Sequence, residues 1–377
     1  MKQGWEIKKL GDITTSINGL WTGKKPPFIT VAVIRNTNFT KDCKLDTSDI
    51  AYIDVEVKQY ASRKLQCGDI IIEKSGGSDK QPVGRPILFN IEEGEYSFSN
   101  FTSTLRVDDR TTILPEFIHR YLAYIYMRGD TAAMQSKTTG IRNLDFTLYK
   151  SIHVPVPPRE EQERIVEELD CLSGVIEKKR EQLRELDALA QSIFYQMFGD
   201  PITNKKGWKV IPLKQAALLK AGKAIKATEL SEDSDLGLYP CYGGNGIRGY
   251  INKKSHNGQF PIIGRQGALC GNVVFAQGEF YATEHAVVCN NIIESFNPLW
   301  LYYALKYNNL NRYAQGVAQP GISVNIINEM PLIYPTLILQ QEFADKIEAI
   351  EKQKELIKQS ITQTEELFNA RMDYYFN

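Results

Sequence analysis

Residues 157–201 decide the fold and read PPREEQERIVEELDCLSGVIEKKREQLRELDALAQSIFYQMFGDP. Pro158 suits the first position of a helix, and the glutamates that follow it suit the positive N-terminal end. Apolar residues then recur in alternating steps of four and three, the heptad spacing of paired helices. They are Ile165, Leu169, Leu172, Ile176, Leu183, Leu186, Ala190, Ile193 and Met197, with Lys179 interrupting the seam. Gly199-Asp200-Pro201 predicts the end of this helix.

A second helix with a similar seam is expected after Pro335. Its apolar positions are Phe343, Ile347, Ile350, Ile357, Ile361 and Phe368, broken by Lys354 and Thr364. A core helix of a large domain is the alternative, but the length and regular spacing favour a paired coil. Short connections would make the pair antiparallel, and about 40 residues span roughly 60 Å. A cation in the seam, such as Lys179 or Lys354, would fix the register at a cost in stability.

An internal repeat organises the rest of the chain. Five features recur in the same order with a slowly shrinking offset, aligned by eye. Residues 4–10 return as 207–213, 68–74 as 258–265, 114–117 as 297–300, Gly140-Ile141 as Gly321-Ile322, and Pro157 with Gln162 as Pro335 with Gln340. We therefore expect an α+β chain in which two mixed α/β domains, related by a pseudo-two-fold, are joined by two long antiparallel helices.

The expected boundaries also separate the charge. Residues 1–156 and 201–336 form the globular domains, with net charges of +3 and +5, and residues 157–200 and 337–377 form the helices, with −5 and −3. The overall charge of zero hides this division. Basic domains are suited to phosphate, and acidic helices to a protein partner.

Composition excludes several classes of protein. No run of about 18 uncharged apolar residues predicts a membrane span, and the first residues lack the apolar core of a signal peptide, so we expect a cytoplasmic protein. The cysteines are scattered without a CxxC pair: Cys43, Cys67, Cys171, Cys241, Cys270 and Cys289. Isolated thiols and only four histidines argue against a disulfide framework, a zinc site or a metal centre.

Two stretches give the chain a family resemblance. Residues 154–165, VPVPPREEQERI, head the first helix, and residues 198–208, FGDPITNKKGW, close it. With them the chain resembles the specificity subunit of type I restriction–modification systems over its whole length: target-recognition domain, helix, target-recognition domain, helix. Residues 336–342, TLILQQE, depart from the family's usual proline-glutamate-glutamine run.

The resemblance implies a subunit with no catalytic centre and no cofactor of its own. It implies assembly with two methyltransferase subunits and, in the full complex, two restriction subunits, which would use S-adenosylmethionine, ATP and Mg²⁺. Each recognition domain would read one half of a split double-stranded DNA target, and the helices would set the gap.

Motifs for catalysis are absent or unsupported. Residues 244–249 match GxGxxG by letter, but no acid follows at the spacing of a dinucleotide site, so a glycine-rich turn is favoured. Residues 297–300, NPLW, partly match an amino-methyltransferase motif, yet their counterpart at Leu114-Pro115 favours a helix start. No phosphate-binding loop ending in Gly-Lys-Ser/Thr occurs.

Two matched loops, residues 74–85 and 264–272, combine cations with glycines. Glycine lets a backbone approach a phosphate or the wall of a groove, and Arg or Lys can contact phosphate or guanine. A solvated hairpin loop is the alternative. The candidate DNA-contacting residues are Lys74, Ser75, Lys80 and Arg85 in the first loop, and Arg265, Gln266 and Asn272 in the second.

A second pair of polar loops, residues 135–143 and 315–321, offers amides that can pair with adenine. The candidates there are Lys137, Thr138, Arg142, Asn143, Gln315 and Gln319. Weaker candidates, for which the alternative is an ordinary exposed polar residue, are Arg35, Asn36, Tyr242, Asn245, Arg248 and Lys253. We interpret His285 as structural, and Trp5 and Trp208, which are equivalent in the repeat, as core anchors.

Two other functions compete with DNA reading. A protein adaptor with two binding domains would lack salt-sensitive duplex binding. An autonomous enzyme would be active with S-adenosylmethionine or ATP on its own. Because the two loop sets differ, DNA reading predicts two different half-sites and an asymmetric target.

Overall fold

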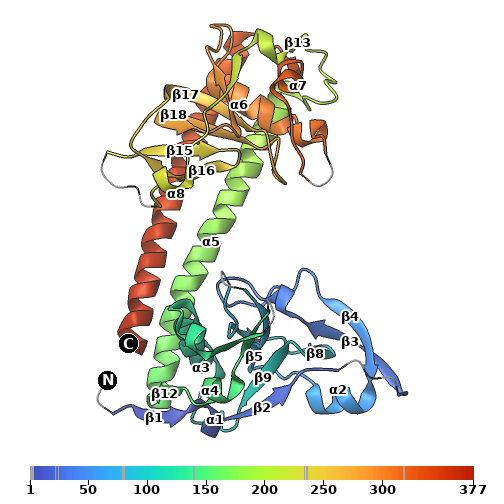
Figure 1. Ribbon diagram of the computed structural model, residues 1–377, viewed down its shortest axis with the longest axis vertical. Coiled ribbons are helices and arrows are strands. Elements are labelled where there is room, and N and C mark those ends of the chain that lie inside the picture. The colour runs from blue at the N-terminus through green and yellow to red at the C-terminus, as the bar shows by residue number, and fades with distance from the viewer. Residues whose placement is uncertain are drawn as a thin grey trace. The chain divides into compact units, whose positions relative to one another are not determined.

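The computed structural model describes residues 4–21, 23, 25–78, 81–138, 141–232, 234, 237–316 and 319–377. The chain forms two compact units: unit 1 comprises residues 1–178 and 361–377, and unit 2 comprises residues 179–360. The division crosses both long helices, so each unit contains a globular part and a portion of each helix (Figure 1).

The central sheet of unit 1 is antiparallel. Its order is β2 (Thr14–Asn18), β9 (Thr102–Val107), β5 (Asp69–Glu73) and β7 (Pro86–Phe89). Three successive isoleucines of β5 have no exposed surface. Because neighbouring side chains of a strand point to opposite faces, Ile70 and Ile72 join the core under α3 (Pro115–Met127), while Ile71 packs with Phe98 on the other side. An uninterrupted apolar strand is thereby buried on both faces.

Smaller elements surround this sheet. A second sheet has the order β4 (Ala51–Glu56), β3 (Phe28–Ile34), β8 (Tyr96–Phe98); a third has the order β10 (Gln135–Thr138), β11 (Ile141–Leu144), β6 (Ser75–Gly77); and β1 (Glu6–Lys9) pairs with β12 (His153–Val156). The short helices are α1 (Leu10–Ile13), η1 (Asn36–Asn38), α2 (Val57–Arg63), η2 (Asp130–Met134) and α4 (Phe146–Lys150).

Unit 2 is built on one larger sheet. Its order is β14 (Leu218–Ala221), β19 (Ala286–Asn290), β17 (His256–Gly264), β18 (Val273–Ala282), β15 (Tyr239–Gly243), β16 (Gly246–Ile251), and β13 (Val210–Pro212) pairs separately with β20 (Pro331–Ile333). The helices are α6 (Pro298–Tyr307), α7 (Val324–Asn328) and the short η3 (Leu213–Gln215), η4 (Ala227–Glu229) and η5 (Leu310–Tyr313). Trp300 and Tyr303 of α6 are fully buried in the core of this unit.

The two units repeat the same connections. The strand order β2-β9-β5-β7 of unit 1 recurs in unit 2 as β14-β19-β17-β18. The backbone N–H of Leu10 donates to Ile152 O at 2.8 Å, and the N–H of Leu213 donates to Met330 O at 2.9 Å. Leu10 and Leu213 are a pair that the sequence repeat matched, so the repeat is structural down to single hydrogen bonds.

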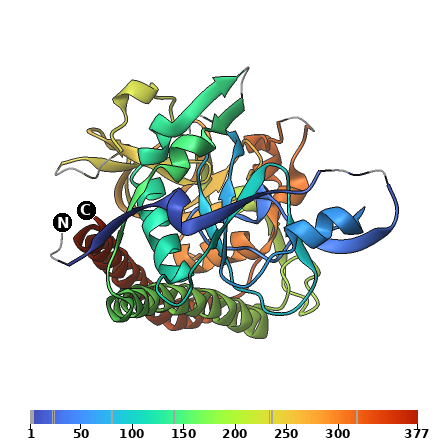
Figure 2. The ribbon, with the colours of Figure 1, turned by 90° about the horizontal axis from the view of Figure 1, so that it is seen from below.

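The long helices α5 (Arg159–Phe198) and α8 (Leu337–Phe376) contain 40 residues each. In unit 1, Arg371 Nη2 donates to Glu168 Oε2 at 3.0 Å, and in unit 2, Lys354 Nζ donates to Asp187 Oδ1 at 2.9 Å. Residue numbers therefore fall along α8 as they rise along α5, and in both units the helices lie side by side and antiparallel (Figures 1 and 2). The predicted α+β chain with two long paired helices is confirmed.

The predicted seam of α5 is buried or half-buried throughout, but the heptad pattern does not describe the last two turns. There the fully buried positions are Ala190, Phe194 and Phe198, spaced by four. Phe194 and Phe198 contact Phe343 of α8, with ring centroids 5.5 and 5.6 Å apart. The sequence pattern missed both phenylalanines because the helix here packs against a globular core as well as against α8.

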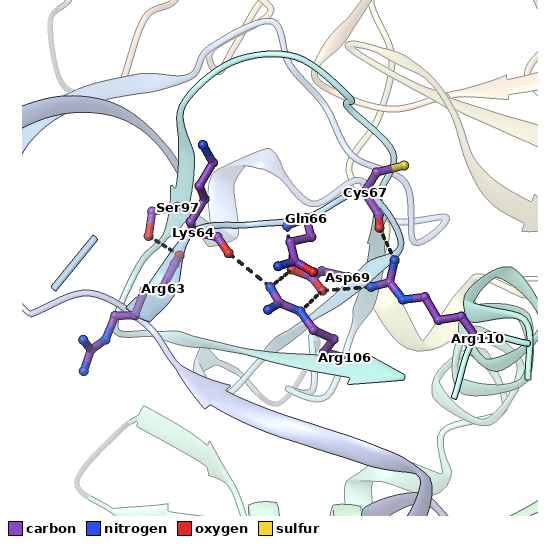
Figure 3. A network of polar contacts seen from close by, with 8 residues as sticks. All are labelled: Arg63, Lys64, Gln66, Cys67, Asp69, Ser97, Arg106 and Arg110. Atoms are coloured by element: carbon purple, nitrogen blue, oxygen red, sulfur yellow. Dashed lines mark hydrogen bonds and ion pairs between the residues drawn. The ribbon is translucent and has the colours of Figure 1, made fainter. Parts of the chain in front are cut away.

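Unit 1 holds a buried carboxylate at the start of β5 (Figure 3). Asp69 is fully buried and accepts two hydrogen bonds from Arg106, at 2.8 and 2.7 Å, and one from the backbone N–H of Gln66 at 2.8 Å. Arg110 Nη1 donates to Cys67 O at 2.6 Å beside it. The hydrogen bond to Asp69 raises the pKa of Arg106. This network fixes the end of β5 opposite to the candidate interface.

Several predictions of structural roles are confirmed. Residues 244–249 lie in the hairpin that joins β15 to β16, and the side chain of Asn297 accepts from Leu299 N and Trp300 N at the start of α6. Trp5 and Trp208 pack against the cores of their units. All six cysteines are free thiols.

Within the described ranges, no group of three or more His, Cys, Asp or Glu side chains is placed to hold a metal ion. None of the helices in this part of the chain combines the length and apolar character that a membrane crossing needs.

Candidate nucleic-acid interface

Lys74 and Arg265 occupy the same place in the two units. The N–H of Lys74 donates to Phe101 O at 2.9 Å, and its carbonyl accepts from Leu144 N at 2.8 Å. The N–H of Arg265 donates to His285 O at 3.1 Å, and its carbonyl accepts from Ile322 N at 2.8 Å. Each cation therefore follows the central strand of its unit and is clamped between two other loops.

This equivalence corrects one detail of the repeat. The sequence alignment paired Ile141 with Ile322, but Leu144 makes the hydrogen bond in unit 1 that Ile322 makes in unit 2. The pairing was wrong by three residues because the β10–β11 hairpin of unit 1 is longer than its counterpart. Gly140, the other member of that aligned pair, lies outside the described residues.

In unit 1, three segments that are far apart in the sequence meet at β6. Asn36 Nδ2 donates to Ser75 O at 2.6 Å, and Ser75 Oγ donates to Asn143 Oδ1 at 2.6 Å. Arg142, next to Asn143, pairs with Gly77 across β11 and β6. The structure thus brings together Asn36, Ser75, Arg142 and Asn143, which the sequence placed in three separate loops.

The side chain of Lys74 is half-buried beside this group. Its Nζ donates to Asn18 Oδ1 at 2.9 Å, and Ser103 Oγ donates to the same oxygen at 3.0 Å. Burial lowers the pKa of Lys74. Asn18 was missed by sequence reasoning, because nothing in the local pattern of β2 marks it; only the sheet brings it to Lys74.

Arg35 lies at the end of β3, next to Asn36. Its guanidinium is held by Asp49, with Nη2 3.4 Å from the backbone oxygen and 3.5 Å from Oδ2. Its backbone N–H donates to Asn38 Oδ1 at 2.9 Å. The structure therefore keeps Arg35 at the edge of the cluster with an acidic partner.

The interpretation of Arg85 as an exposed DNA contact in the loop 74–85 is wrong. Only 4% of its side chain is exposed, and it forms an ion pair with the equally buried Glu73 at 3.1 Å. The guanidinium also lies over the ring of Phe39. A buried and paired guanidinium cannot meet a phosphate without unpacking the core, so we withdraw Arg85 from the candidate contacts. Burial is also the cause that raises the pKa of Glu73.

Three candidates, Lys80, Lys137 and Thr138, lie in or next to segments that the structure describes only in part. Lys80 lies outside the described residues. Lys137 and Thr138 belong to β10, where Lys137 pairs with Arg142 in the backbone register. Their backbone is therefore next to the cluster at β6.

In unit 2 the same loops converge on Gln266. Gly321 forms bridges with both Gln266 and Gln315, and Gly267 N donates to Pro320 O at 2.9 Å. These bridges correspond to the β6-β11-β10 sheet of unit 1. Arg265, Gln266, Gln315 and Gln319 are consequently neighbours or lie on neighbouring loops.

The turn after β15 approaches the same place. A Cβ on Gly264 would lie 1.9 Å from Gly244 O, so only glycine lets the two backbones come this close. Asn245, in this turn, is exposed. Asn272 lies opposite, where its carbonyl accepts from Gly264 N at 2.8 Å.

The remaining candidates of unit 2, Tyr242, Arg248 and Lys253, lie on or after β15 and β16. Tyr242 is half-buried, packs on Phe280 with ring centroids 5.3 Å apart, and has its pKa raised by burial. The stem of Arg248 lies over Gly243, since a Cβ there would come within 2.4 Å of Arg248 Cδ. Lys253 lies beyond β16, where its Nζ pairs with Glu229 Oε2 at 2.6 Å.

The chain matches a known protein family over most of its length. A family model described as the type I restriction modification DNA specificity domain matches residues 2–187 and 205–366. The second matched segment begins at the point where the internal repeat begins.

Curated relatives are similar over parts of the chain. The specificity subunit of the type I restriction enzyme EcoprrI of Escherichia coli is 48% identical over 120 residues, which are 32% of this chain and 30% of that protein. The EcoKI specificity subunit of Escherichia coli K12 is 26% identical over 238 residues, or 61% of this chain and 50% of that protein. The chain thus spans half or less of the length of these two relatives.

Solved structures are similar over nearly the whole chain. The S subunit of a type I restriction–modification system from M. genitalium matches with a TM-score of 0.59 and 14% identity, covering 98% of this chain and 95% of that one. A structure from work on complex assembly and conformational transition of the type I R-M system matches with a TM-score of 0.53 and 16% identity, covering 100% and 98%. At such low identity these matches establish the fold.

Proposed function

This chain belongs to the family of type I restriction–modification DNA specificity domains, and from this premise we propose that it is the sequence-specificity subunit of a type I restriction–modification complex. The globular domains, residues 1–156 and 201–336, each read one half of a bipartite, asymmetric double-stranded DNA target. The helices, residues 157–200 and 337–377, set the gap between the two halves.

The equivalent placement of Lys74 and Arg265 is the observation that carries this proposal. Both cations follow the central strand, both are clamped by the same two backbone hydrogen bonds, and both stand among amide side chains and glycine turns. Cations contact phosphate or guanine, and amides contact adenine in the major groove. A protein adaptor gives no reason for a cationic residue to stand at the same place in both halves.

The side chains around these two cations form the proposed reading surface of each domain. In unit 1 they are Asn36, Lys74, Ser75, Arg142 and Asn143; in unit 2 they are Asn245, Arg248, Arg265, Gln266, Asn272, Gln315 and Gln319. The polar members differ between the domains, which supports two different half-sites. Arg35 and Tyr242 border these surfaces and contribute through the backbone turns they hold.

The chain works without a catalytic centre or a cofactor of its own. Methyltransferase activity with S-adenosylmethionine and ATP-dependent endonuclease activity with Mg²⁺ belong to two methyltransferase and two restriction subunits. The acidic helices, with net charges of −5 and −3, offer these partners a surface distinct from the basic reading domains.

Mapping methyladenine after co-expression with the methyltransferase subunit tests the proposal. The expected result is one bipartite, non-palindromic target. Lys74→Ala weakens recognition of one half and Arg265→Ala that of the other, and each lowers the slope of log affinity against log salt by about 1 if the contact is to phosphate. A palindromic target, or binding without salt dependence, contradicts the proposal.

The role of the helices has its own test. Deleting one heptad from α5 and one from the facing part of α8 shortens the pair by about 10 Å. The expected result is a target with the same half-site letters and a smaller gap. Changed letters with an unchanged gap would refute the assignment of spacing to the helices.

A further inference from the structure

The two units share a third loop beside the reading surface, the tight turn that leads into β9 in unit 1 and into β19 in unit 2. In unit 1, Thr102 N donates to Ser99 O at 3.0 Å, and in unit 2, Ala286 N donates to Thr283 O at 3.0 Å. The residues carried at the third position of these turns are Phe101 and His285. They are the residues whose carbonyls hold Lys74 N and Arg265 N.

Close backbone contacts fix both turns. A Cβ on Gly19 would lie 1.8 Å from Ser99 O, and a Cβ on Gly222 would lie 2.0 Å from Ala282 O and 2.7 Å from Thr283 O. Neither glycine can be replaced without moving the turn. The residues at 101 and 285 are therefore presented by a rigid backbone, as a reading residue requires.

Phe101 is a large apolar residue that is exposed beside polar residues. Its side chain is 51% exposed, although its carbonyl also accepts from Ser75 N at 3.2 Å and so lies against a polar cluster. No core requires a phenylalanine there, and an exposed aromatic ring among cations and amides is suited to an apolar contact with a base. Thymine offers such a contact through its C5-methyl group in the major groove.

We propose that the turn residues are specificity determinants, and that Phe101 reads the methyl group of a thymine in the half-site of unit 1. His285, at the same position in unit 2, reads a hydrogen-bonding base edge instead, which replaces its interpretation from the sequence as a structural residue. Its Nε2 lies 3.2 Å from Glu284 Oε1, so the imidazole is oriented by a carboxylate on the same turn. This inference rests on the proposed function and assigns different chemistry to the two half-sites.

Replacing thymine by deoxyuridine removes only the methyl group and tests the assignment. Binding of the full chain with its methyltransferase partner is measured on duplexes in which each thymine of the mapped target is replaced in turn. At least one replacement weakens binding by wild-type protein by about three- to ten-fold. Phe101→Ala loses the same factor on the normal target and becomes insensitive to that replacement.

Phe28→Ala is the matched control. Phe28 is 47% exposed, close to the exposure of Phe101, but lies at the opposite end of β3 from the reading surface. This variant keeps the wild-type response to every replacement. His285→Ala also keeps the response to thymine replacement, and instead relaxes the base preference at one position of the other half-site.

The outcomes separate the inference from the proposed function. If wild-type protein shows no sequence-dependent binding, the proposed function fails. If it binds its target but no thymine is sensitive to loss of the methyl group, or if Phe101→Ala remains as sensitive as wild type, the role of Phe101 is overturned. Loss of complex assembly with undisturbed DNA preference would mark Phe101 as a protein contact and would likewise overturn it.

Discussion

Gln162 and Gln340 make the same three hydrogen bonds in the two units. Both side chains are fully buried. The side-chain oxygens accept from Leu114 N and Asn297 N, each at 2.9 Å. The amide nitrogens donate to the carbonyls of Thr112 and Pro157 in unit 1 and of Ser295 and Pro335 in unit 2. Each glutamine thus ties the first turn of a long helix to the start of the helix that covers the sheet.

Gln162→Met and Gln340→Met are expected to destabilise unit 1 and unit 2, respectively, by about 2–3 kcal/mol. Methionine has nearly the same shape as glutamine but leaves a buried N–H and two buried carbonyls without partners. Each unsatisfied buried group costs its desolvation free energy. Amide hydrogen exchange checks this, because α3 should exchange faster in the first variant and α6 in the second. Gln182→Met, at an exposed position of α5, is the control. Equal acceleration in both units would contradict two independent ties.

Arg85→Met is expected to cost about 3–5 kcal/mol, because it leaves the Glu73 carboxyl buried without its ion-pair partner. The double variant Glu73→Leu/Arg85→Met replaces the whole pair by apolar groups and recovers most of this loss. Urea unfolding measures both. The salt dependence of DNA binding by the double variant should match that of wild type, since Arg85 is buried. A slope lowered by about 1 would mean that Arg85 contacts phosphate.

His119→Gln is expected to remove part of the acid sensitivity of unit 1. The imidazole is buried, with Nε2 3.0 Å from Cys43 O, and burial, followed by the charge of Arg120, lowers its pKa from 6.5 to about 4. The unfolded chain therefore takes up this proton first, and stability is lost as the pH falls from 6.5 to about 4. The shift corresponds to about 3 kcal/mol.

The measurement is the free energy of unfolding between pH 7 and pH 4. His119→Gln keeps an N–H donor for Cys43 O and gives a flatter curve in this range, although its stability at pH 7 is lower. His153→Gln, at an exposed position, is the control for the loss of an imidazole. If His119→Gln leaves the slope as steep as in wild type, the imidazole is not the group that titrates.

Features that recur along the sequence, such as the heptads and the internal repeat, could be predicted from it. Neighbours that meet only when the sheets form could not. Heptad spacing predicted the two long paired helices, and the repeat aligned Lys74 with Arg265. Asn18 and Phe101 carried no local signal, because they reach Lys74 from β2 and from the turn before β9. Arg85 was wrongly predicted to be exposed, because a cation in a glycine-rich loop usually is. Its buried ion-pair partner, Glu73, lies twelve residues earlier and gives no signal in the local sequence.

Lys179→Leu is expected to stabilise the helix pair by about 1 kcal/mol or to shift its alignment. Lys179 is half-buried in the seam, and its Nζ donates to Ser360 Oγ and, at 3.4 Å, to Ser360 O. A seam cation of this kind trades stability for register. Thermal unfolding and the oligomeric state of the variant check the effect. Both unchanged would show that Lys179 does not specify the pairing.

Lys354 is expected to behave differently, because its partners are charged. Its side chain is 10% exposed, and its Nζ contacts Asp187 Oδ1 on α5 at 2.9 Å and Glu351 Oε1 on its own helix at 2.8 Å. Lys354→Met therefore destabilises, since it removes the cation that contacts both carboxylates and leaves Asp187 with the more distant Lys306 Nζ, at 3.7 Å. A double-mutant cycle of Lys354→Met with Asp187→Asn should give a coupling of about 1–3 kcal/mol. Lys352→Met, which lies on the exposed face of α8, controls for the loss of a positive charge. Additive effects of the two substitutions would mean that the ion pair does not hold α8 against α5.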